Sequence, residues 1–267
     1  MAPYRLGTTS YIIPAGLADN ARYLRDHVQD MELVLFDLPD GQCNFPDAAE
    51  VAALRAVGAQ GLSYTVHLPL DLRLAADGSA DHLSLRQARR VIELTRPLPP
   101  WAYVMHLDGR EVLAAQRAGQ ATAALVGAWQ DQAARALELV ADWVGGPERL
   151  AVENLEGYPL DFILPVLARV PVSRCVDVGH LWLDGHDPLP YLQAALPRLR
   201  VVHLHGLNAA GRDHQSVAHM PRERLTPVLA LLRTAEYRGV LTLEVFGEDD
   251  FHSSLAALAA ADPPEAR

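Results

Sequence analysis

Val201-Val202-His203-Leu204 is an almost wholly apolar run, and Glu32-Leu33-Val34-Leu35-Phe36 has the same character. A strand with one face in water would alternate between apolar and polar residues, and neither run does so. Runs of this kind are typical of strands in a parallel sheet that is covered by helices on both faces. We therefore expect an α/β protein built around a buried parallel sheet.

Six more runs of this kind are spaced along the chain, and each is followed by a loop and a helical pattern. The eight predicted strands are Tyr4–Ser10, Met31–Leu38, Leu62–Leu68, Trp101–His106, Leu150–Asn154, Arg174–Asp177, Val201–His205 and Val240–Val245. Eight strand–helix units of roughly 33 residues each predict a single (β/α)8 TIM barrel over residues 1–267. An open doubly wound sheet is the alternative.

The helical stretches between the strands show apolar residues at spacings of three and four. The clearest is Ala121–Val144, where Leu125, Trp129, Ala133, Leu137 and Val140 form one stripe and Gly145-Gly146-Pro147 ends the helix. Shorter helices are predicted near residues 16–28, 48–59, 83–96, 159–169, 188–198, 222–236 and 251–260. The irregular stretches Pro69–His82, Leu107–Gln120 and Gly206–Pro221 follow strands, so we expect them on the C-terminal rim of the barrel.

The composition of the chain limits which classes of molecule it is expected to bind. The net charge is −10, which counts against nucleic acid, because proteins that grip phosphate backbones usually carry a basic face. No apolar stretch reaches the roughly 18–20 residues that a membrane helix needs. The start of the chain lacks a secretory signal, and Cys43 and Cys175 are too few for a disulfide framework. We expect a cytoplasmic protein with a small-molecule substrate.

Ionisable residues lie at or just beyond the ends of the predicted strands. They are His67, His106, Glu153, Asp177, His180, His203, His214 and Glu244. Any one of them alone could be an ordinary rim residue, but the strand ends of a barrel all meet at one rim, so the full set is expected to share a pocket. Clustered carboxylates repel one another, and a divalent cation held by imidazole and carboxylate groups removes that repulsion. The pattern predicts a metal site.

Other candidates are left outside this site. Five histidines are predicted to lie on the surface: His27, His82, His186, His219 and His252. Asp108 and Asp184 are interpreted as acids in loop turns. Cys175 is interpreted as a residue of the packed core. His205 is assigned to the opposite side of its strand from His203, unless the strand ends before it. Cys43 is given no catalytic role, and the chain has no glycine-rich phosphate loop or serine elbow.

The ordered set of strand-end residues resembles the metal site of the xylose isomerase-like barrel superfamily, which includes enzymes of the endonuclease IV type. The residues that carry the resemblance are His67, His106, Glu153, Asp177-Val178-Gly179-His180, His203, His214 and Glu244. The resemblance spans nearly the whole chain. Its most specific parts are the Asp-x-Gly-His motif and the two strand-end glutamates.

Three segments are similar to a narrower group in that superfamily, the cobamide-remodelling phosphodiesterases. These segments are Arg5–Pro14, Glu32–Phe36 and Tyr64–Leu72. Members of the group hydrolyse a phosphoester in the nucleotide loop of corrinoid cofactors. The resemblance implies a metal-dependent hydrolase that acts on a cobamide.

The superfamily resemblance also implies a role for each ligand. His67 and His106 would hold one metal ion, with Glu153 bridging to a second ion that is completed by Asp177, His203 and Glu244. His180 and His214 would hold a third ion, together with an acid from the loop after the seventh strand, for which Asp213 is the candidate. The resemblance implies two to three ions per chain, and a mixed imidazole and carboxylate donor set suits Zn²⁺ or Mn²⁺.

Two positions depart from that pattern. Enzymes of the endonuclease IV type have an aspartate two residues before the last histidine, and this chain has Arg212 there. The pair Leu204-His205 that follows His203 also differs from the usual acidic or amide ending. The third site is therefore the least complete of the three.

The predicted reaction is hydrolysis of a phosphodiester, in which Glu153 or Glu244 positions the attacking water or takes its proton. The alternative enzyme is a sugar isomerase or epimerase that uses the same two glutamates to shuttle a proton about one metal ion. A corrinoid-binding module without turnover is a third hypothesis. Repair of DNA is disfavoured by the acidic charge balance.

Overall fold

The structure is a computed structural model that describes residues 2–38 and 40–261. Eight parallel strands pair in chain order and close into a barrel, because β8 pairs with β1 as well as with β7. The strands are β1 (Arg5–Thr9), β2 (Asp30–Val34), β3 (Ser63–His67), β4 (Tyr103–Met105), β5 (Leu150–Glu153), β6 (Ser173–Asp177), β7 (Leu199–Leu204) and β8 (Val240–Leu243). The predicted barrel is confirmed, and the closed pairing excludes the open sheet.

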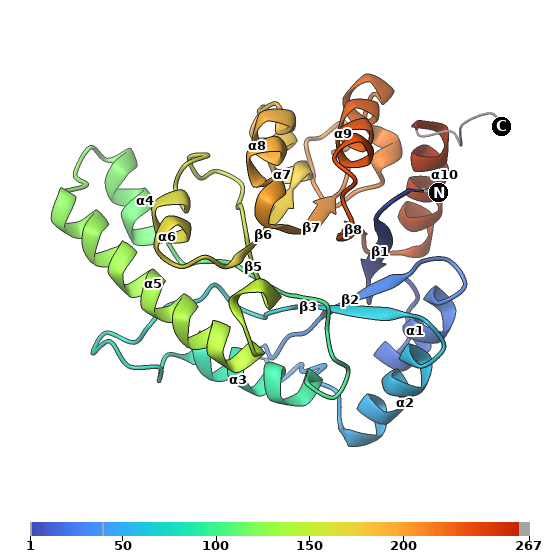
Figure 1. Ribbon diagram of the computed structural model, residues 1–267, viewed down its shortest axis with the longest axis horizontal. Helices are drawn as coiled ribbons and strands as arrows, with labels where there is room; N and C mark the ends of the chain where they lie inside the picture. The colour runs from blue at the N-terminus through green and yellow to red at the C-terminus, as the bar shows by residue number, and fades with distance from the viewer. Residues whose placement is uncertain (1, 39, 262–267) are drawn as a thin grey trace.

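Helices surround the ring of strands (Figure 1). They are α1 (Leu17–Leu24), α2 (Ala48–Gly58), α3 (Leu83–Thr95), α4 (Arg110–Arg117), α5 (Ala123–Val144), α6 (Leu164–Arg169), α7 (Val178–Leu183), α8 (Pro188–Ala195), α9 (Arg222–Thr234) and α10 (Glu248–Ala261). Short 3-10 turns occupy Pro147–Arg149, Leu196–Arg198 and Val217–His219. None of the helices in the described ranges is long and apolar enough to cross a membrane.

The longest helix, α5, begins and ends where the sequence indicates. The hydroxyl of Thr122 accepts a hydrogen bond from the backbone N–H of Leu125, which satisfies a free donor at the first turn. At the other end Gly145 adopts the left-handed conformation (φ 87°) that glycine tolerates best. The predicted stripe faces the barrel, with Ala133, Leu137 and Val140 buried.

Two short helices lie where the sequence indicated loops. The stretch Leu107–Gln120 was expected to be irregular, but it contains α4, and the Asp-x-Gly-His segment forms α7. Both helices have eight or fewer residues, so neither shows enough turns for a periodic apolar stripe to be recognised. The side chain of Asp177 caps α7 by accepting a hydrogen bond from the His180 N–H.

A small apolar layer inside the barrel supports the site. Five side chains form a buried cluster that is separate from the larger core between strands and helices. They are Ala102, Val104, Ala151, Cys175 and Val201. Residues two positions apart on a strand share a face. His106, Glu153, Asp177 and His203 each follow a member of this layer by two positions, so they line the next layer toward the C-terminal rim.

At the opposite, N-terminal end of the barrel, a polar group is buried among the strands. The Asp30 carboxylate is fully buried and accepts a hydrogen bond from the Ser63 hydroxyl at 2.5 Å. Arg5 donates to the same hydroxyl at 3.0 Å, and its guanidinium lies 4.0 Å from the ring centre of Trp101. This group closes the end of the barrel that lies away from the predicted metal site.

Candidate metal centre

Side chains at the C-terminal strand ends form three adjoining groups of potential metal ligands, and a fourth group joins Glu153 and His203 to the buried Cys175 thiol below them. The His67 cluster is His67, His106 and Glu153; the His203 cluster is Glu153, Asp177, His203 and Glu244; the His180 cluster is His180, His205 and His214. Within each cluster, one ligand atom per residue lies within 4.8 Å of the others. All eight strand-end residues predicted from the sequence therefore meet at this rim.

Glu153, at the end of β5, connects two of the clusters. One carboxylate oxygen, Oε2, lies 3.3 Å from Nε2 of His67 and 3.2 Å from Nε2 of His106. The other, Oε1, lies 3.1 Å from Nδ1 of His203. Burial alone would raise the pKa of Glu153, but His203 and His106 outweigh it and hold the pKa well below its usual range. Glu153 is thus an ionised carboxylate that faces a different cluster with each oxygen.

The two histidines of the His67 cluster have their second ring nitrogens occupied. Nδ1 of His67 lies 3.0 Å from the carbonyl oxygen of Leu68, and Nδ1 of His106 lies 3.2 Å from Oδ1 of Asp71. These contacts place the proton on Nδ1 and leave Nε2 of each ring facing Glu153, as in metal-ligating histidines. Burial would lower the pKa of His106, but Glu153 and Asp71 raise it to about 10.

His203 is fully buried and is oriented by an acid that the sequence analysis did not select. Its Nε2 lies 3.0 Å from Oε2 of Glu32, a fully buried residue of β2. Its Nδ1 faces Glu153 and lies 3.2 Å from Oε2 of Glu244. The available signal for Glu32 was an acid inside an otherwise apolar strand. Asp71 was missed for another reason, since it lies in a stretch expected to be loop.

Asp177 is fixed at the end of β6 by a neighbouring amide. The Asn154 side chain accepts from the Asp177 N–H and donates to the Asp177 carbonyl, both at 3.0 Å. Oδ1 of Asp177 caps α7, and Oδ2 is buried with no hydrogen-bond partner. Oε2 of Glu244 is likewise buried without one. Buried carboxylate oxygens that lie beside imidazoles but have no hydrogen-bond partner fit a divalent cation, since their desolvation is only partly compensated.

The His180 cluster lies on the loop side of the rim. Nδ1 of His180 lies 3.2 Å from the Asn154 carbonyl oxygen, and Nδ1 of His214 lies 3.4 Å from Oδ1 of Asp213. Nε2 of His214 lies 3.6 Å from Oε2 of Glu244. Burial would lower the pKa of His214, but Glu244 raises it to about 9. Asp213 contacts the outer nitrogen of His214 and is not a member of the cluster.

The assignment of His205 to the far side of the strand is wrong. Residues two apart on a strand share a face, so His205 follows His203 to the same side, and β7 has already ended at Leu204. The side chain of His205 is fully buried, and its ring stacks on that of His214 with centres 4.4 Å apart. His205 therefore belongs to the site from which the sequence analysis excluded it.

A cavity of about 390 Å³ opens over the clusters. Six cluster residues line this cavity, and Arg110, Glu156 and Tyr158 complete its wall. The six are His67, His106, Glu153, His180, His214 and Glu244. The volume is within the range of small-molecule sites. Arg110, from the unexpected helix α4, brings a guanidinium to its wall, and both Nε and Nη2 of that group bind Asp108 at 3.0 Å.

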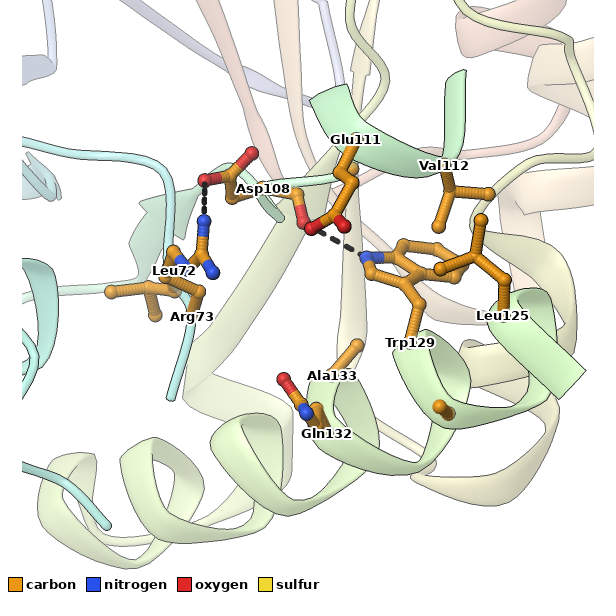
Figure 2. Close-up of a pocket in the computed structure, with 11 residues that line it drawn as sticks. Leu72, Arg73, Asp108, Glu111, Val112, Leu125, Trp129, Gln132 and Ala133 are labelled. Atoms are coloured by element: carbon orange, nitrogen blue, oxygen red, sulfur yellow. Dashed lines mark hydrogen bonds and ion pairs between the residues drawn. The ribbon is translucent and has the colours of Figure 1, made fainter. Parts of the chain in front are cut away.

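A second cavity of about 200 Å³ lies on the other side of Asp108 (Figure 2). Arg73 contacts the Asp108 carboxylate at 3.4 Å, and the Trp129 indole donates to the Asp108 backbone carbonyl at 2.8 Å. No member of the three clusters lines this cavity. Asp108 is buried between two arginines, so it does more than turn a surface loop, and its role is to anchor α4 beside the metal-ligand clusters.

The other histidines lie outside the three clusters. His27, His219 and His252 are exposed, and His82 and His186 are half-buried but belong to none of the clusters. His82 instead caps α3 by accepting from the Ser84 N–H. Cys175 packs in the small apolar layer, as predicted, but its thiol also lies beside Glu153 and His203, and burial raises the pKa of this thiol well above its usual value.

Solved structures with similar folds cover almost the entire chain. Endonuclease IV from Thermus thermophilus aligns with a TM-score of 0.66 at 19% identity, covering 96% of this chain and 98% of its own. The 3-keto-D-glucoside 4-epimerase from E. coli also scores 0.66, at 14% identity, covering 97% of this chain and 98% of its own. At these identities the likeness establishes the fold alone.

A third similar structure is the probable 3-DHS dehydratase of Bacillus anthracis. Its TM-score is 0.65 at 14% identity, and the alignment covers 97% of this chain and 100% of its own. No curated protein matches the sequence. A family profile described as xylose isomerase-like TIM barrel matches residues 26–265. With its closed eight-stranded barrel and strand-end ligands, the chain belongs to the xylose isomerase-like TIM barrel family.

Proposed function

We propose that this protein is a multi-metal phosphodiesterase that hydrolyses a phosphoester in the nucleotide loop of a cobamide. The observation that carries the proposal is the arrangement of Glu153, whose two oxygens face two ligand clusters while a third lies beside them. Adjoining metal sites that share a bridging carboxylate suit in-line displacement at phosphorus. The cobamide as substrate rests on the resemblance of Arg5–Pro14, Glu32–Phe36 and Tyr64–Leu72 to that phosphodiesterase group.

The ligand chemistry supports two or three divalent ions. His67, His106 and Glu153 would hold one ion, and Glu153, Asp177, His203 and Glu244 a second. Bound ions would supply Lewis-acid stabilisation of the phosphoryl oxygens and lower the pKa of a bound water. A donor set mixed from imidazole and carboxylate suits Zn²⁺, and its carboxylate share also suits Mn²⁺.

The chain's own residues would orient the substrate and move the proton. Glu244 lines the cavity, so it would position the attacking water or take its proton. Glu153, held between His203 and His106, stays ionised and fixes the positions of both clusters. Arg110 would pair with an anionic or carbonyl group of the substrate at the cavity wall. A small-molecule partner and a cytoplasmic location belong to the same proposal.

A sugar epimerase or isomerase is the second candidate function. Glu153 and Glu244 both lie beside His203 within one cluster, which is the arrangement that a proton-shuttling pair about one metal ion needs. Epimerases are also among the proteins with similar folds. The hydrolase is favoured because the chain places two further ligand clusters beside this one, which is more than a single-ion reaction requires.

The test is incubation of the metal-loaded protein with a complete cobamide, followed by chromatography and mass spectrometry of the products. Release of an incomplete corrinoid together with the lower-ligand nucleoside or its phosphate is expected. Glu153→Gln should reduce the rate at least about 100-fold, because it removes the charge that both clusters share. The exposed Glu93→Gln on α3 is the matched control.

Each alternative gives a different result in the same assay. Intact cobamide with both Zn²⁺ and Mn²⁺ would exclude the phosphodiesterase. Exchange of a sugar's α-proton with solvent would then identify the epimerase. Tight corrinoid binding without products, unchanged in Glu153→Gln, would instead indicate a binding module.

A further inference from the structure

We propose that His205 is a positioning residue, which holds His214 at the metal centre and does not bind metal itself. The inference rests on metal binding at the proposed centre, but it does not depend on the reaction. His214 comes from the loop that follows β7, whereas the other ligand candidate of this cluster, His180, lies on α7. A ligand on a loop needs contacts that fix its place, and His205 supplies them from the end of the strand.

The hydrogen bonds of His205 fix its tautomer. Nδ1 lies 3.0 Å from the backbone nitrogen of His214, and because a backbone N–H can only donate, Nδ1 accepts and the ring proton is on Nε2. The competing partner of Nδ1, the Gly206 carbonyl oxygen, is farther away at 3.4 Å and already accepts from the Gln215 N–H. The ring therefore has no free nitrogen lone pair for a metal ion.

The backbone of His214 depends on this hydrogen bond. Its φ is 50°, in the left-handed region that residues other than glycine rarely adopt. Such a conformation persists only where the surrounding contacts enforce it. Gly206 and Gln215 exchange two backbone hydrogen bonds at the base of the loop, and the bond from the His214 N–H to His205 lies directly beside them. His205 thus stabilises the turn that brings His214 to the rim.

The ring of His214 is held as well as its backbone. It stacks on the ring of His205, with the two centres 4.4 Å apart and the planes 15° apart. In this orientation Nε2 of His214 lies 3.6 Å from Oε2 of Glu244, a member of the neighbouring His203 cluster. One buried ring therefore sets both the position of the His214 backbone and the direction of its imidazole.

His205 can act in this way because its own ring is fixed. Its side chain is fully buried, and a Cβ atom at Gly179 would lie 2.2 Å from its Cε1, so the Asp-x-Gly-His segment leaves room for the ring and no more. Gly179 is not in the left-handed region, so its backbone conformation does not require glycine. Nε2 lies 3.3 Å from Oδ1 of Asp177, an electrostatic contact that is not a hydrogen bond. The ring thus connects the ends of β6 and β7.

The experiment compares His205→Leu with His205→Asn. Leucine has a similar volume but no acceptor, whereas Oδ1 of asparagine lies where Nδ1 was and can accept the same N–H. The first readout is hydrogen exchange of the His214 amide, followed by NMR in the isotope-labelled, metal-free protein. This amide should exchange at least about tenfold faster in His205→Leu than in the wild type, and His205→Asn should retain the protection. The exposed His219→Asn is the control.

The second readout is the affinity for Zn²⁺, measured by competition with a chromophoric chelator. The step of the titration that His214→Gln removes belongs to the His180 cluster. Binding in that step should weaken by about 10- to 100-fold in His205→Leu, as for other residues that orient a ligand, and should stay close to the wild type in His205→Asn. A ligand role for His205 predicts the same loss in both variants.

Equal exchange of the His214 amide in the wild type and His205→Leu would overturn the inference, and so would an equal loss of zinc affinity in His205→Leu and His205→Asn. If His205→Leu does not fold, His205→Gln replaces it, because its amide reaches the position of Nε2 and leaves no acceptor at Nδ1. A wild type that binds no zinc would refute the proposed function. The exchange measurement uses no metal, so it would still decide whether His205 holds His214.

Discussion

Glu32 and His203 form a buried pair in which a carboxylate sets the orientation of a metal-ligand candidate. Both side chains are fully buried, and the 3.0 Å contact between Oε2 and Nε2 leaves Nδ1 of His203 facing Glu153 and Glu244. Carboxylate partners of this kind fix the tautomer of the ring and increase its basicity as a ligand. Glu32 therefore influences the metal centre without being a member of any cluster.

Glu32→Gln should weaken metal binding in the His203 cluster by about 10- to 100-fold. The amide is uncharged, so it stabilises the ligating tautomer less than the carboxylate does. Competition with a chromophoric chelator measures the dissociation constant, and Glu93→Gln supplies the exposed control. Equal constants for the two variants would mean that Glu32 only fills space in the barrel.

At the scale of the element, β2 carries two acids on its inward face, Asp30 at its start and Glu32 two residues further on. Glu32 points to the metal centre, whereas Asp30 lies at the N-terminal end of the barrel beside Ser63 and Arg5. Burial raises the pKa of Asp30 to about 6, and the hydrogen bond from Ser63 and the charge of Arg5 offset only part of that effect. One strand thus orients a candidate metal ligand with one acid and buries the other at a cost in stability.

Asp30→Asn should stabilise the fold increasingly as the pH rises. Between the ordinary value of 3.8 and the raised pKa of about 6, the folded chain binds more protons than the unfolded chain. The free energy of unfolding of the wild type therefore falls with rising pH through this window. The advantage of the variant should grow by on the order of 2 kcal/mol between pH 4 and pH 7.

Chemical denaturation of wild type and variant at both pH values measures this difference, and the exposed Asp26→Asn is the control. Any fixed cost of altering the hydrogen bond from Ser63 cancels when the two pH values are compared. A difference that shrinks as the pH rises would show that Asp30 is ionised favourably in the folded state.

For the molecule as a whole, the ligand clusters concentrate buried charge at one end of the barrel. Four carboxylate side chains are buried there, and several of their oxygens have no hydrogen-bond partner. They belong to Glu32, Glu153, Asp177 and Glu244. Repulsion among these carboxylates opposes folding, and divalent cations offset it. Metal ions bound by these clusters would therefore stabilise the barrel.

Removal of metal with a chelator should lower the melting temperature. Metal held at about 1,000 times its dissociation constant stabilises the native state by about 4 kcal/mol, which corresponds to roughly 10 °C for a chain of this size. Differential scanning calorimetry before chelation, after chelation and after return of Zn²⁺ or Mn²⁺ measures the effect. A melting temperature that is the same in all three states would contradict this stabilisation.

The sequence predicted the barrel because eight apolar runs carry a strong and repeated signal. It also predicted the eight strand-end residues that meet in the clusters. It did not predict α4 and α7, whose few turns carry no recognisable stripe. Glu32 was missed because its role depends on a contact with His203 on a strand far along the chain, and Asp71 because it lies in a stretch expected to be loop. His205 was missed because it was assigned to the face opposite His203, whereas residues two apart on a strand share a face.

The contact between Gly179 and His205 also constrains how this chain can change over evolutionary time. A substitution at Gly179 while His205 is present would drive a new Cβ into the imidazole ring. Replacement of His205 by a smaller residue first would remove that obstacle. The two positions are therefore epistatic, and mutational paths that change position 205 before position 179 are open while the reverse order is closed.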